Sequence, residues 1–180
     1  MSKASRVLIY LLRRDLRLAD NPIFHEIGKL NGQSQKPFTH LLPVYIYPAE
    51  QIEVSGFLSS SSEKSPYQEA RSVAGNFWRC GRLRSKFIAE SVWDLKKDLE
   101  KAGSGLAIRV GHFQDVVKSI LDAFRDRDDI EVHGLWMTRE EGWEEKQQER
   151  HVERVLDAEG IQFKLWKDEK YFVDESVSSA

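Results

Sequence analysis

The sequence predicts an α/β fold, a doubly wound, Rossmann-like sheet of five parallel strands in the order 3-2-1-4-5, with helices on both faces. Two observations carry this prediction. Apolar, strand-like runs alternate along the chain with segments of helical periodicity, which is typical of a parallel sheet with right-handed crossovers. The first run, 7–12, is unbroken, as expected of a central strand covered on both faces, although its periodicity alone also fits a short buried helix.

The other elements are predicted from the same patterns. Asn21 is a good N-cap and Pro22 a good first helical residue, so a helix is expected at 22–30. Pro43 interrupts the second apolar run and predicts that strand pairing starts only at Val44. The complete set comprises strands at 7–12, 38–47, 106–110, 130–137 and 161–166, and helices at 22–30, 82–101, 113–125 and 138–158.

The helix at 82–101 has the clearest periodicity, because its apolar residues, which include Leu83 and Phe87, recur at three- and four-residue steps. The segment before it, 48–80, shows no sustained periodicity and is predicted to be a long loop that is mobile at 59–65. Its second half contains large rings that favour burial, so we expect it to pack against other parts of the protein, such as a missing domain. These rings are Tyr67, Phe77 and Trp78.

The helix at 138–158 has a polar first half. Thr138 and Glu141 match a capping box, which predicts that the helix begins there. Trp143 is the only large apolar residue between 139 and 150. One interpretation is a solvated surface. The other is that this half lines a cleft at the carboxyl edge of the sheet, where a carboxylate suits a ligand with paired N–H donors. The carboxylates concerned are Glu140, Glu141, Glu144 and Glu145.

Composition limits the function classes. The 180 residues suffice for one domain with its own core, and 41% hydrophobic and 31% charged residues are typical of a soluble globular protein. A net charge of −2 gives no general attraction to nucleic acid, so DNA binding would need a local basic patch or another domain. The single cysteine, Cys80, excludes an internal disulfide. No apolar run approaches the roughly 20 residues of a membrane span, and the first residues lack a secretory signal.

Several common site motifs are absent from the sequence. No glycine-rich dinucleotide motif follows the first strand, and no P-loop lysine motif occurs. The five histidines lie far apart and have no cysteine or carboxylate at metal-ligand spacing, so we expect no metal site. Cys80 and Ser60 lack a nucleophile-elbow context, and Cys80 is interpreted as a bystander thiol.

A dense group of charges follows the first strand. The stretch Arg14-Asp-Leu-Arg-Leu-Ala-Asp-Asn21 resembles the first-strand motif of the photolyase/cryptochrome family. The alternative interpretation is purely structural. In it Arg14, Asp15, Arg17 and Asp20 form an ion-pair cluster that holds the loop in place. Asn21 closes the motif and opens the next helix.

Two further stretches extend this resemblance. The polar helix resembles the family segment in which a glutamate holds the pterin ring of a methenyltetrahydrofolate antenna. Alignment through the Arg-His-Val-Glu-Arg run assigns that role to Glu145, and a shift of register would assign it to Glu144 or Glu141. The segment 80–95 and the following Gly-Ser-Gly-Leu run are similar to the DASH cryptochromes, especially fungal members. In that branch Arg84 matches a recurrent arginine near the domain junction.

The resemblance implies an antenna-binding α/β domain over residues 1–172, followed by a frayed tail at 173–180. It implies that FAD is held by a helical domain that this chain lacks, and that the chain alone catalyses nothing and binds the antenna weakly or not at all. The parent protein would use FAD and blue light to repair pyrimidine dimers in single-stranded DNA or to signal, and it alone would contact DNA. We expect a monomer with no membrane contact, in the cytoplasm or nucleus, with an organelle as an alternative.

Other interpretations remain open at this stage. One alternative is that the chain is a freestanding, non-catalytic interaction module. This alternative predicts an open patch formed by residues 13–17, Trp143 and the 67–80 segment. A nucleotide binder of the electron-transfer-flavoprotein or universal-stress type is disfavoured because the glycine-rich loop is missing. Folate, deazaflavin and flavin antennae all occur on this fold within the wider family, so the sequence does not identify the antenna.

Overall fold

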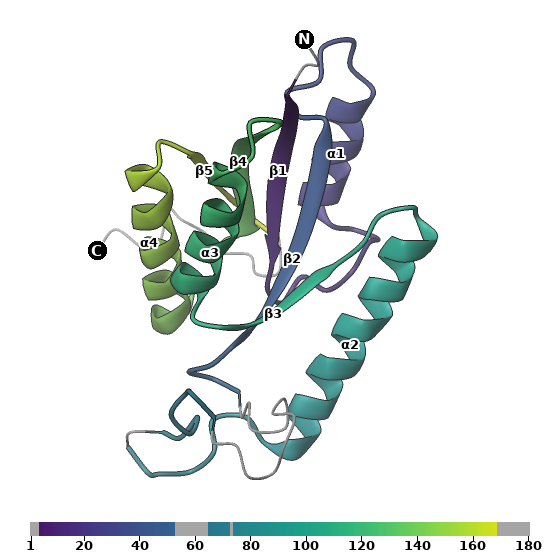
Figure 1. Ribbon diagram of the computed structural model, residues 1–180. Helices are drawn as coiled ribbons and strands as arrows, with labels where there is room; N and C mark the ends of the chain where they lie inside the picture. The colour runs from purple at the N-terminus through teal and green to yellow at the C-terminus, as the bar shows by residue number, and fades with distance from the viewer. Residues whose placement is uncertain (1–3, 53–64, 73, 169–180) are drawn as a thin grey trace, which may run out of the picture.

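The fold is a five-stranded parallel sheet with helices on both faces, seen in a computed structural model that describes residues 4–52, 65–72 and 74–168 (Figure 1). The strand order β3-β2-β1-β4-β5 confirms the predicted order 3-2-1-4-5. The strands are β1 (Ser5–Leu12), β2 (His40–Pro48), β3 (Ala107–Gly111), β4 (Ile130–Thr138) and β5 (Gln162–Trp166). The helices are α1 (Pro22–Asn31), α2 (Arg82–Lys101), α3 (Phe113–Arg125) and α4 (Trp143–Ala158).

Some predictions fall outside the described residues. These are the frayed tail at 173–180 and nearly all of the mobile segment predicted at 59–65. None of the helices in the described ranges combines the length and the apolar composition that a bilayer-crossing segment requires.

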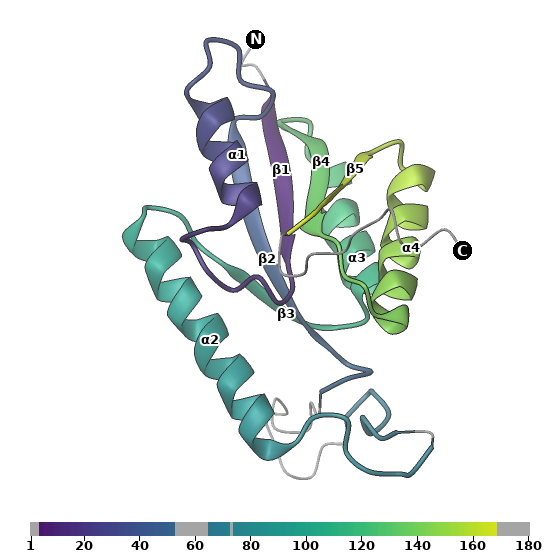
Figure 2. The same ribbon diagram turned by 180° about the vertical axis from the view of Figure 1, so that it is seen from behind.

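Strand β1 is the central strand, as its unbroken apolar run predicts. It pairs in parallel with β2 on one side and with β4 on the other, and all of its residues from Val7 to Leu12 are buried. Helices α1 and α2 cover one face of the sheet, and α3 and α4 cover the other (Figures 1 and 2). Alternate β1 side chains therefore enter two separate cores, with Tyr10 in the first and Ile9 in the second.

Pro43 does not delay pairing, contrary to the prediction. Strand β2 pairs with β1 from His40 onward, and Pro43 itself lies opposite Tyr10. Pairing between β2 and β3 begins only at Val44, one residue after the proline. The missing N–H is tolerated because Pro43 lies where β2 has a ladder partner on one side only.

Helix α2 extends beyond the sheet. Its second half packs on the first core through Val92, Leu95 and Leu99. Its first half projects past the carboxyl edge of the sheet (Figure 1), and there Leu83 and Phe87 are 84% and 69% exposed. The apolar stripe of α2 is therefore not covered by the sheet in the first two turns, because the sheet ends before the helix does.

Helix α4 begins at Trp143, four residues later than the capping box would require, and its N-cap is Gly142. Thr138 is instead the last residue of β4, where it pairs with Trp166 of β5. The ladder continues one step further, since the backbone N–H of Arg139 donates to the carbonyl of Trp166 at 2.8 Å. The capping-box prediction is wrong because strand pairing holds Thr138 in extended conformation.

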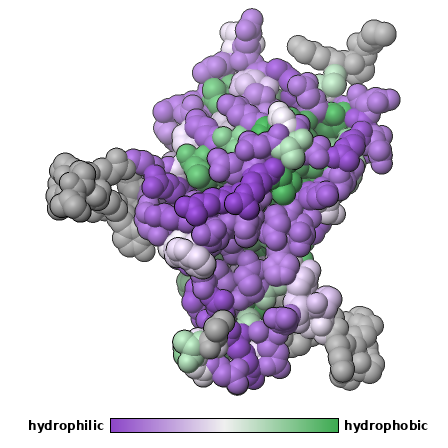
Figure 3. Space-filling model, turned by 90° about the vertical axis from the view of Figure 1, so that its left-hand side faces the viewer, coloured by the Kyte–Doolittle hydropathy of each residue, from purple (hydrophilic) through white to green (hydrophobic). Residues whose placement is uncertain are grey.

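The outer surface of α4 is hydrophilic. Arg150, Glu153 and Arg154 are exposed on it. Figure 3 views the molecule from the side on which α4 lies in Figure 1 and shows a mainly hydrophilic surface with scattered apolar patches. This surface is typical of a solvated helix face.

Asn21 caps α1 as predicted and also links the helix to the core. Its side-chain oxygen accepts from the backbone N–H groups of Ile23 and Phe24, each at 3.0 Å. Its amide nitrogen donates to the buried hydroxyl of Tyr10 at 2.8 Å. One side chain thus satisfies two helix N–H groups and fixes the start of α1 against β1.

We expect Asn21→Ala to lower the free energy of unfolding by about 2 kcal/mol, because it removes the cap and one buried hydrogen bond, each worth about 1 kcal/mol. Urea unfolding measures this change. His25→Ala, on the exposed side of the same helix, is the matched control and should change the free energy by less than about 0.5 kcal/mol. Equal effects of the two substitutions would contradict the assigned role of Asn21.

Candidate functional site

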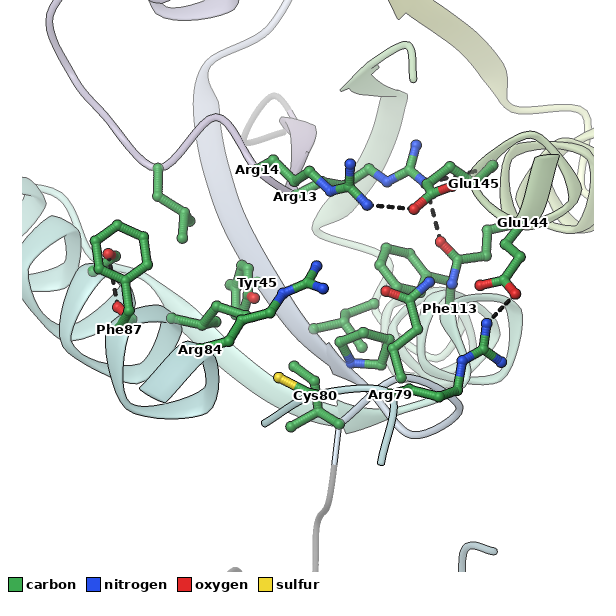
Figure 4. Close-up of a pocket in the computed structure, with 18 residues that line it drawn as sticks. Arg13, Arg14, Tyr45, Arg79, Cys80, Arg84, Phe87, Phe113, Glu144 and Glu145 are labelled. Atoms are coloured by element: carbon green, nitrogen blue, oxygen red, sulfur yellow. Dashed lines mark hydrogen bonds and ion pairs between the residues drawn. The ribbon is translucent and has the colours of Figure 1, made fainter. Parts of the chain in front are cut away.

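A cleft of about 410 Å³ opens at the carboxyl edge of the sheet. That volume lies within the range of small-molecule sites. The loop after β1 and the end of β2 form its base, with the first turns of α2 on one side and the start of α4 on the other (Figure 4). Its wall combines rings with charged groups, including Arg13, Arg14, Tyr45, Arg79, Arg84, Phe87, Phe113, Glu144 and Glu145.

The base of the cleft is held by a buried ion pair. Arg13 directly follows β1, and its guanidinium donates to the Glu149 carboxylate of α4 at 2.7 Å, with only 4% and 7% of the two side chains exposed. The same guanidinium donates to Gln148 Oε1 at 3.0 Å and to the backbone carbonyl of Glu145 at 3.3 Å. Arg13 therefore fixes the first half of α4 against the central strand. It is not part of an open surface, so the patch predicted for residues 13–17 is wrong at this position.

The polar network continues from Gln148 to residues that follow β2 and β3. Gln148 Nε2 donates to Glu50 Oε1 at 2.8 Å, and Glu50 Oε2 lies 3.0 Å from Nδ1 of His112. Segments that follow β1, β2 and β3 are thus joined through side chains of α4. Within the described ranges, no group of three or more His, Cys, Asp or Glu side chains has the geometry of a metal site.

Two further ion pairs line the rim and decide between the candidate glutamates. Glu145 pairs with Arg14, and Glu144 pairs with Arg79. Both carboxylates face the cleft (Figure 4). Glu141 instead pairs with Lys146 at 2.8 Å, which holds the pKa of this exposed carboxyl below its usual value. The structure therefore brings Glu145 and Glu144 together at the cleft and leaves Glu141 outside it.

Glu145 is the more enclosed of these two carboxylates, since its side chain is 13% exposed against 45% for Glu144. It lies at the third helical position of α4, close against the backbone of the N-cap Gly142. A Cβ at position 142 would collide with Glu145 Oε2, so the lack of a side chain there permits this close approach. The helix N-terminus favours a negative charge at this place.

The charged loop after β1 is not an internal ion-pair cluster, contrary to the prediction. Asp15 is fully buried and accepts from the Tyr10 hydroxyl and, at 2.9 Å, from the backbone N–H of Arg13. Arg17 contacts the backbone carbonyl of Asp20 and pairs with Asp168 at 2.9 Å. The charges pair mainly with groups from other segments, because the loop is pressed between the sheet edge and its neighbours.

Arg84 lies in the first turn of α2, and its guanidinium reaches toward the middle of the cleft (Figure 4). The structure thus assigns it to the cleft wall. Tyr45 lies beside it on β2 and is 5% exposed. Tyr45, Arg79, Phe113, Gln148 and Glu149 are site residues that sequence reasoning missed. The polar character of residues 147–149 within a core-packed helix was the only available signal for the last two.

The large rings near the cleft are partly exposed. Tyr67 donates to the carbonyl of Val110 at 3.3 Å and contacts the ring of His112 edge-on. Trp78 is 41% exposed under the guanidinium of Arg71, and Phe77 is 63% exposed. Trp143 at the start of α4 is 75% exposed. Of these three rings, only Tyr67 is held by contacts at the end of β3 within the described chain, whereas Ala70 and Cys80 of the same segment are buried.

Comparison with known proteins decides the family. The family model described as DNA photolyase matches residues 8–179. The chain belongs to the DNA photolyase family. It is 50% identical, over 95% of its length, to the putative cryptochrome DASH of Gibberella zeae. It is 47% identical, over the same share, to the putative mitochondrial cryptochrome DASH of Neurospora crassa.

The solved structures agree with this assignment at the level of the fold. The Synechocystis sp. PCC6803 cryptochrome superposes with a TM-score of 0.70 over 93% of this chain, at 23% identity. An archaeal photolyase from Sulfolobus tokodaii, solved with two FAD molecules and implying a novel light-harvesting cofactor, gives 0.60 over 89% at 20% identity. The chain corresponds to the amino-terminal α/β domain of DASH-type members.

This chain spans about a quarter of its relatives. It covers 24% of the Gibberella zeae protein, 22% of the Neurospora crassa protein and 28% of the Synechocystis chain. One relative is named mitochondrial, and an Arabidopsis thaliana relative is named chloroplastic/mitochondrial. Members of this branch therefore include organellar proteins.

We expect Arg13→Met to lower the free energy of unfolding by about 3 kcal/mol or more, because it leaves the buried carboxylate of Glu149 without its charged partner. The double variant Arg13→Met/Glu149→Met should recover much of this loss, since no charge is then buried alone. Denaturant unfolding of the two variants measures the difference. If the double variant is less stable than Arg13→Met alone, the pair is not the cause.

The Tyr10 hydroxyl predicts an alkaline limit to stability. Burial, together with the neighbouring Asp15 carboxylate, raises the pKa of Tyr10 far above its ordinary value of 10.0. Above pH 10 the folded state therefore binds more protons than the unfolded state, and stability falls as pH rises. We expect Tyr10→Phe to be less stable near pH 7 but to lose about 1.4 kcal/mol less per pH unit above pH 10.

Urea unfolding at several pH values above and below 10 measures this dependence. His25→Ala, on the exposed side of α1, is the control and should keep the slope of the unmodified chain because it leaves every tyrosine in place. An unchanged slope in Tyr10→Phe would contradict the role assigned to this hydroxyl.

Proposed function

We propose that the cleft binds a light-harvesting antenna chromophore, methenyltetrahydrofolate, and that Glu145 holds the N–H donors of its pterin ring. Glu144 is the adjacent alternative. The observation that carries the proposal is the place of Glu145: an enclosed carboxylate at the rim of a 410 Å³ cleft, beside the charged loop after the central strand. When bound, the pterin would absorb light and pass the excitation to a flavin.

The residues present fit such a ring. Phe87 and Phe113 line the cleft with apolar surface, and a carboxylate accepts paired N–H donors in its own plane. Arg14 engages Oε1 of Glu145 in this structure. Because each carboxylate oxygen accepts more than one hydrogen bond, the ion pair leaves acceptor capacity and orients the group. We therefore expect Arg14 to act as a positioning residue for Glu145.

We further propose that a helical FAD-binding domain of the same protein packs over the cleft. The exposed side chains of Leu83, Phe87 and Trp143 near the cleft support this. A second support is that the chain spans only about a quarter of the length of its relatives. The complete protein would use FAD and blue light to repair pyrimidine dimers in single-stranded DNA or to signal. Flavin chemistry and DNA contact would belong to that second domain, and the folded protein would act as a monomer.

A second candidate function is a non-catalytic interaction module of photolyase type. The exposure of Phe77 and Trp143, at 63% and 75%, favours a contact surface of some kind. The two candidates differ in the cleft: an antenna domain binds the pterin through a carboxylate, whereas an interaction module has no need of that ligand.

The test is binding of methenyltetrahydrofolate to the chain and to two matched variants. We expect weak binding to the unmodified chain, since the proposed second domain would supply the rest of the site. Glu145→Gln should weaken binding about tenfold or more by removing a charge-assisted hydrogen bond, and Glu144→Gln should change it by less than about threefold. Equilibrium dialysis with absorbance detection measures both. Equal binding by the unmodified chain and Glu145→Gln would contradict the proposed role of Glu145.

A further inference from the structure

The arginines that line the cleft are not equally satisfied. Three of the four have a carboxylate partner within 4 Å, namely Arg13, Arg14 and Arg79. Arg84 has neither a hydrogen bond nor an ion pair in the parts of the chain that the structure describes, yet its guanidinium extends into the cleft (Figure 4). A guanidinium presents planar paired donors that match a carboxylate or a phosphate.

A second group in the same wall lacks a partner. The Tyr45 side chain is 5% exposed and lines the cleft, and its hydroxyl has no hydrogen bond among the described residues. Burial raises the pKa of this hydroxyl, so it remains a protonated donor, while the nearby guanidinium groups of Arg14 and Arg84 act in the opposite direction. This hydroxyl is not one of the fully enclosed polar atoms that lack a partner in the described residues, so it reaches the cleft and can donate to a ligand acceptor there.

The start of α2 departs from the usual charge pattern of helices. Its first turn has no acidic residue but contains Arg82 and Arg84, and its N-cap Gly81 offers no side-chain hydrogen bond. Positive charge at a helix N-terminus is unfavourable. Departures of this kind are expected where a residue serves a site rather than the local fold.

We infer that Arg84 and Tyr45 form an oxyanion subsite, on the α2 side of the cleft and opposite the Glu144 and Glu145 carboxylates of α4. The cleft is then polarised, so that its ligand carries N–H donors at one end and a carboxylate or phosphate at the other. This inference rests on the proposed function in taking the cleft as a chromophore site, and adds the anionic group that the ligand needs. A folate side chain and a flavin nucleotide phosphate both supply that chemistry.

Matched probes separate these two sources. One pair is pterin-6-carboxylate and 6-methylpterin, and the other is flavin mononucleotide and riboflavin, so that the members of each pair differ mainly in the anionic group. Binding to the complete 180-residue chain is measured by ligand-observed NMR and calorimetry. The variants are Arg84→Gln, Tyr45→Phe and the control Arg109→Gln, an exposed arginine of β3 outside the cleft.

We expect the unmodified chain to bind the anionic member of at least one pair about tenfold tighter than its neutral partner, as one charge-assisted contact predicts. Arg84→Gln should abolish that preference while leaving the neutral member within about twofold, and Tyr45→Phe should reduce it about threefold. Arg109→Gln should have no effect. The pair that shows the preference identifies the source of the anion.

Three results would overturn the subsite: equal affinity for both members of both pairs, an Arg84→Gln variant that weakens anionic and neutral probes alike, or anionic probes that do not bind at millimolar concentration. Glu145→Gln separates this failure from failure of the proposed function, because it should weaken both pterins equally. An effect of Arg84→Gln without an effect of Glu145→Gln would retain the subsite and refute the pterin contact. Circular dichroism and the thermal midpoint check that each variant is folded.

Discussion

The buried guanidinium of Arg13 is the contact on which the arrangement of the cleft depends. It directly follows the central strand, and its partners Glu149 and Gln148 both belong to α4. Because a buried charge is tolerated only beside its partner, this pair fixes the position of α4 relative to the sheet edge. Glu144 and Glu145 lie one to two turns earlier in the same helix. The Arg13 contact at the base of the cleft therefore also fixes the position of their carboxylates at the rim. The charge of Arg13 thus serves the geometry of the site through its contacts with α4 at the base of the cleft.

The rest of the fold provides a rigid base for this contact. Strand β1 is buried on both faces, and Tyr10 is hydrogen-bonded to both Asp15 and Asn21. The charged loop is thereby tied at its beginning, through Asp15, and at its end, through the helix cap. Because the loop is held at both ends, Arg14 has a defined position. It can therefore orient the carboxylate of Glu145, with which it pairs. The family motif in this loop mainly holds the loop in place, and Arg14 is its charged member that reaches the cleft.

Several features that are unfavourable for local secondary structure or burial lie around the cleft. Basic residues occupy the first turn of α2, the Tyr45 hydroxyl at the cleft wall has no hydrogen bond in the described ranges, and the first half of α4 is polar. The cores, by contrast, combine apolar side chains with regular periodicity. Departures from local preference are expected at functional sites, so this edge of the sheet is where a binding site is expected. Leu83 and Phe87 are exposed near the same edge, in the first two turns of α2.

The sequence by itself determined the sheet order, the central place of β1 and the Asn21 cap, because apolar periodicity and capping are local properties. One of its two interpretations of the polar helix put four glutamates, Glu145 among them, beside the loop after β1, because carboxyl ends of parallel strands meet at one edge. Only the tertiary structure decided that Thr138 extends β4 rather than capping a helix, since that depends on pairing with Trp166. It alone chose distant partners for the loop charges and left Arg84 facing the cleft without one in the described chain. Ion pairing between segments depends on three-dimensional distance, which no spacing along the chain records.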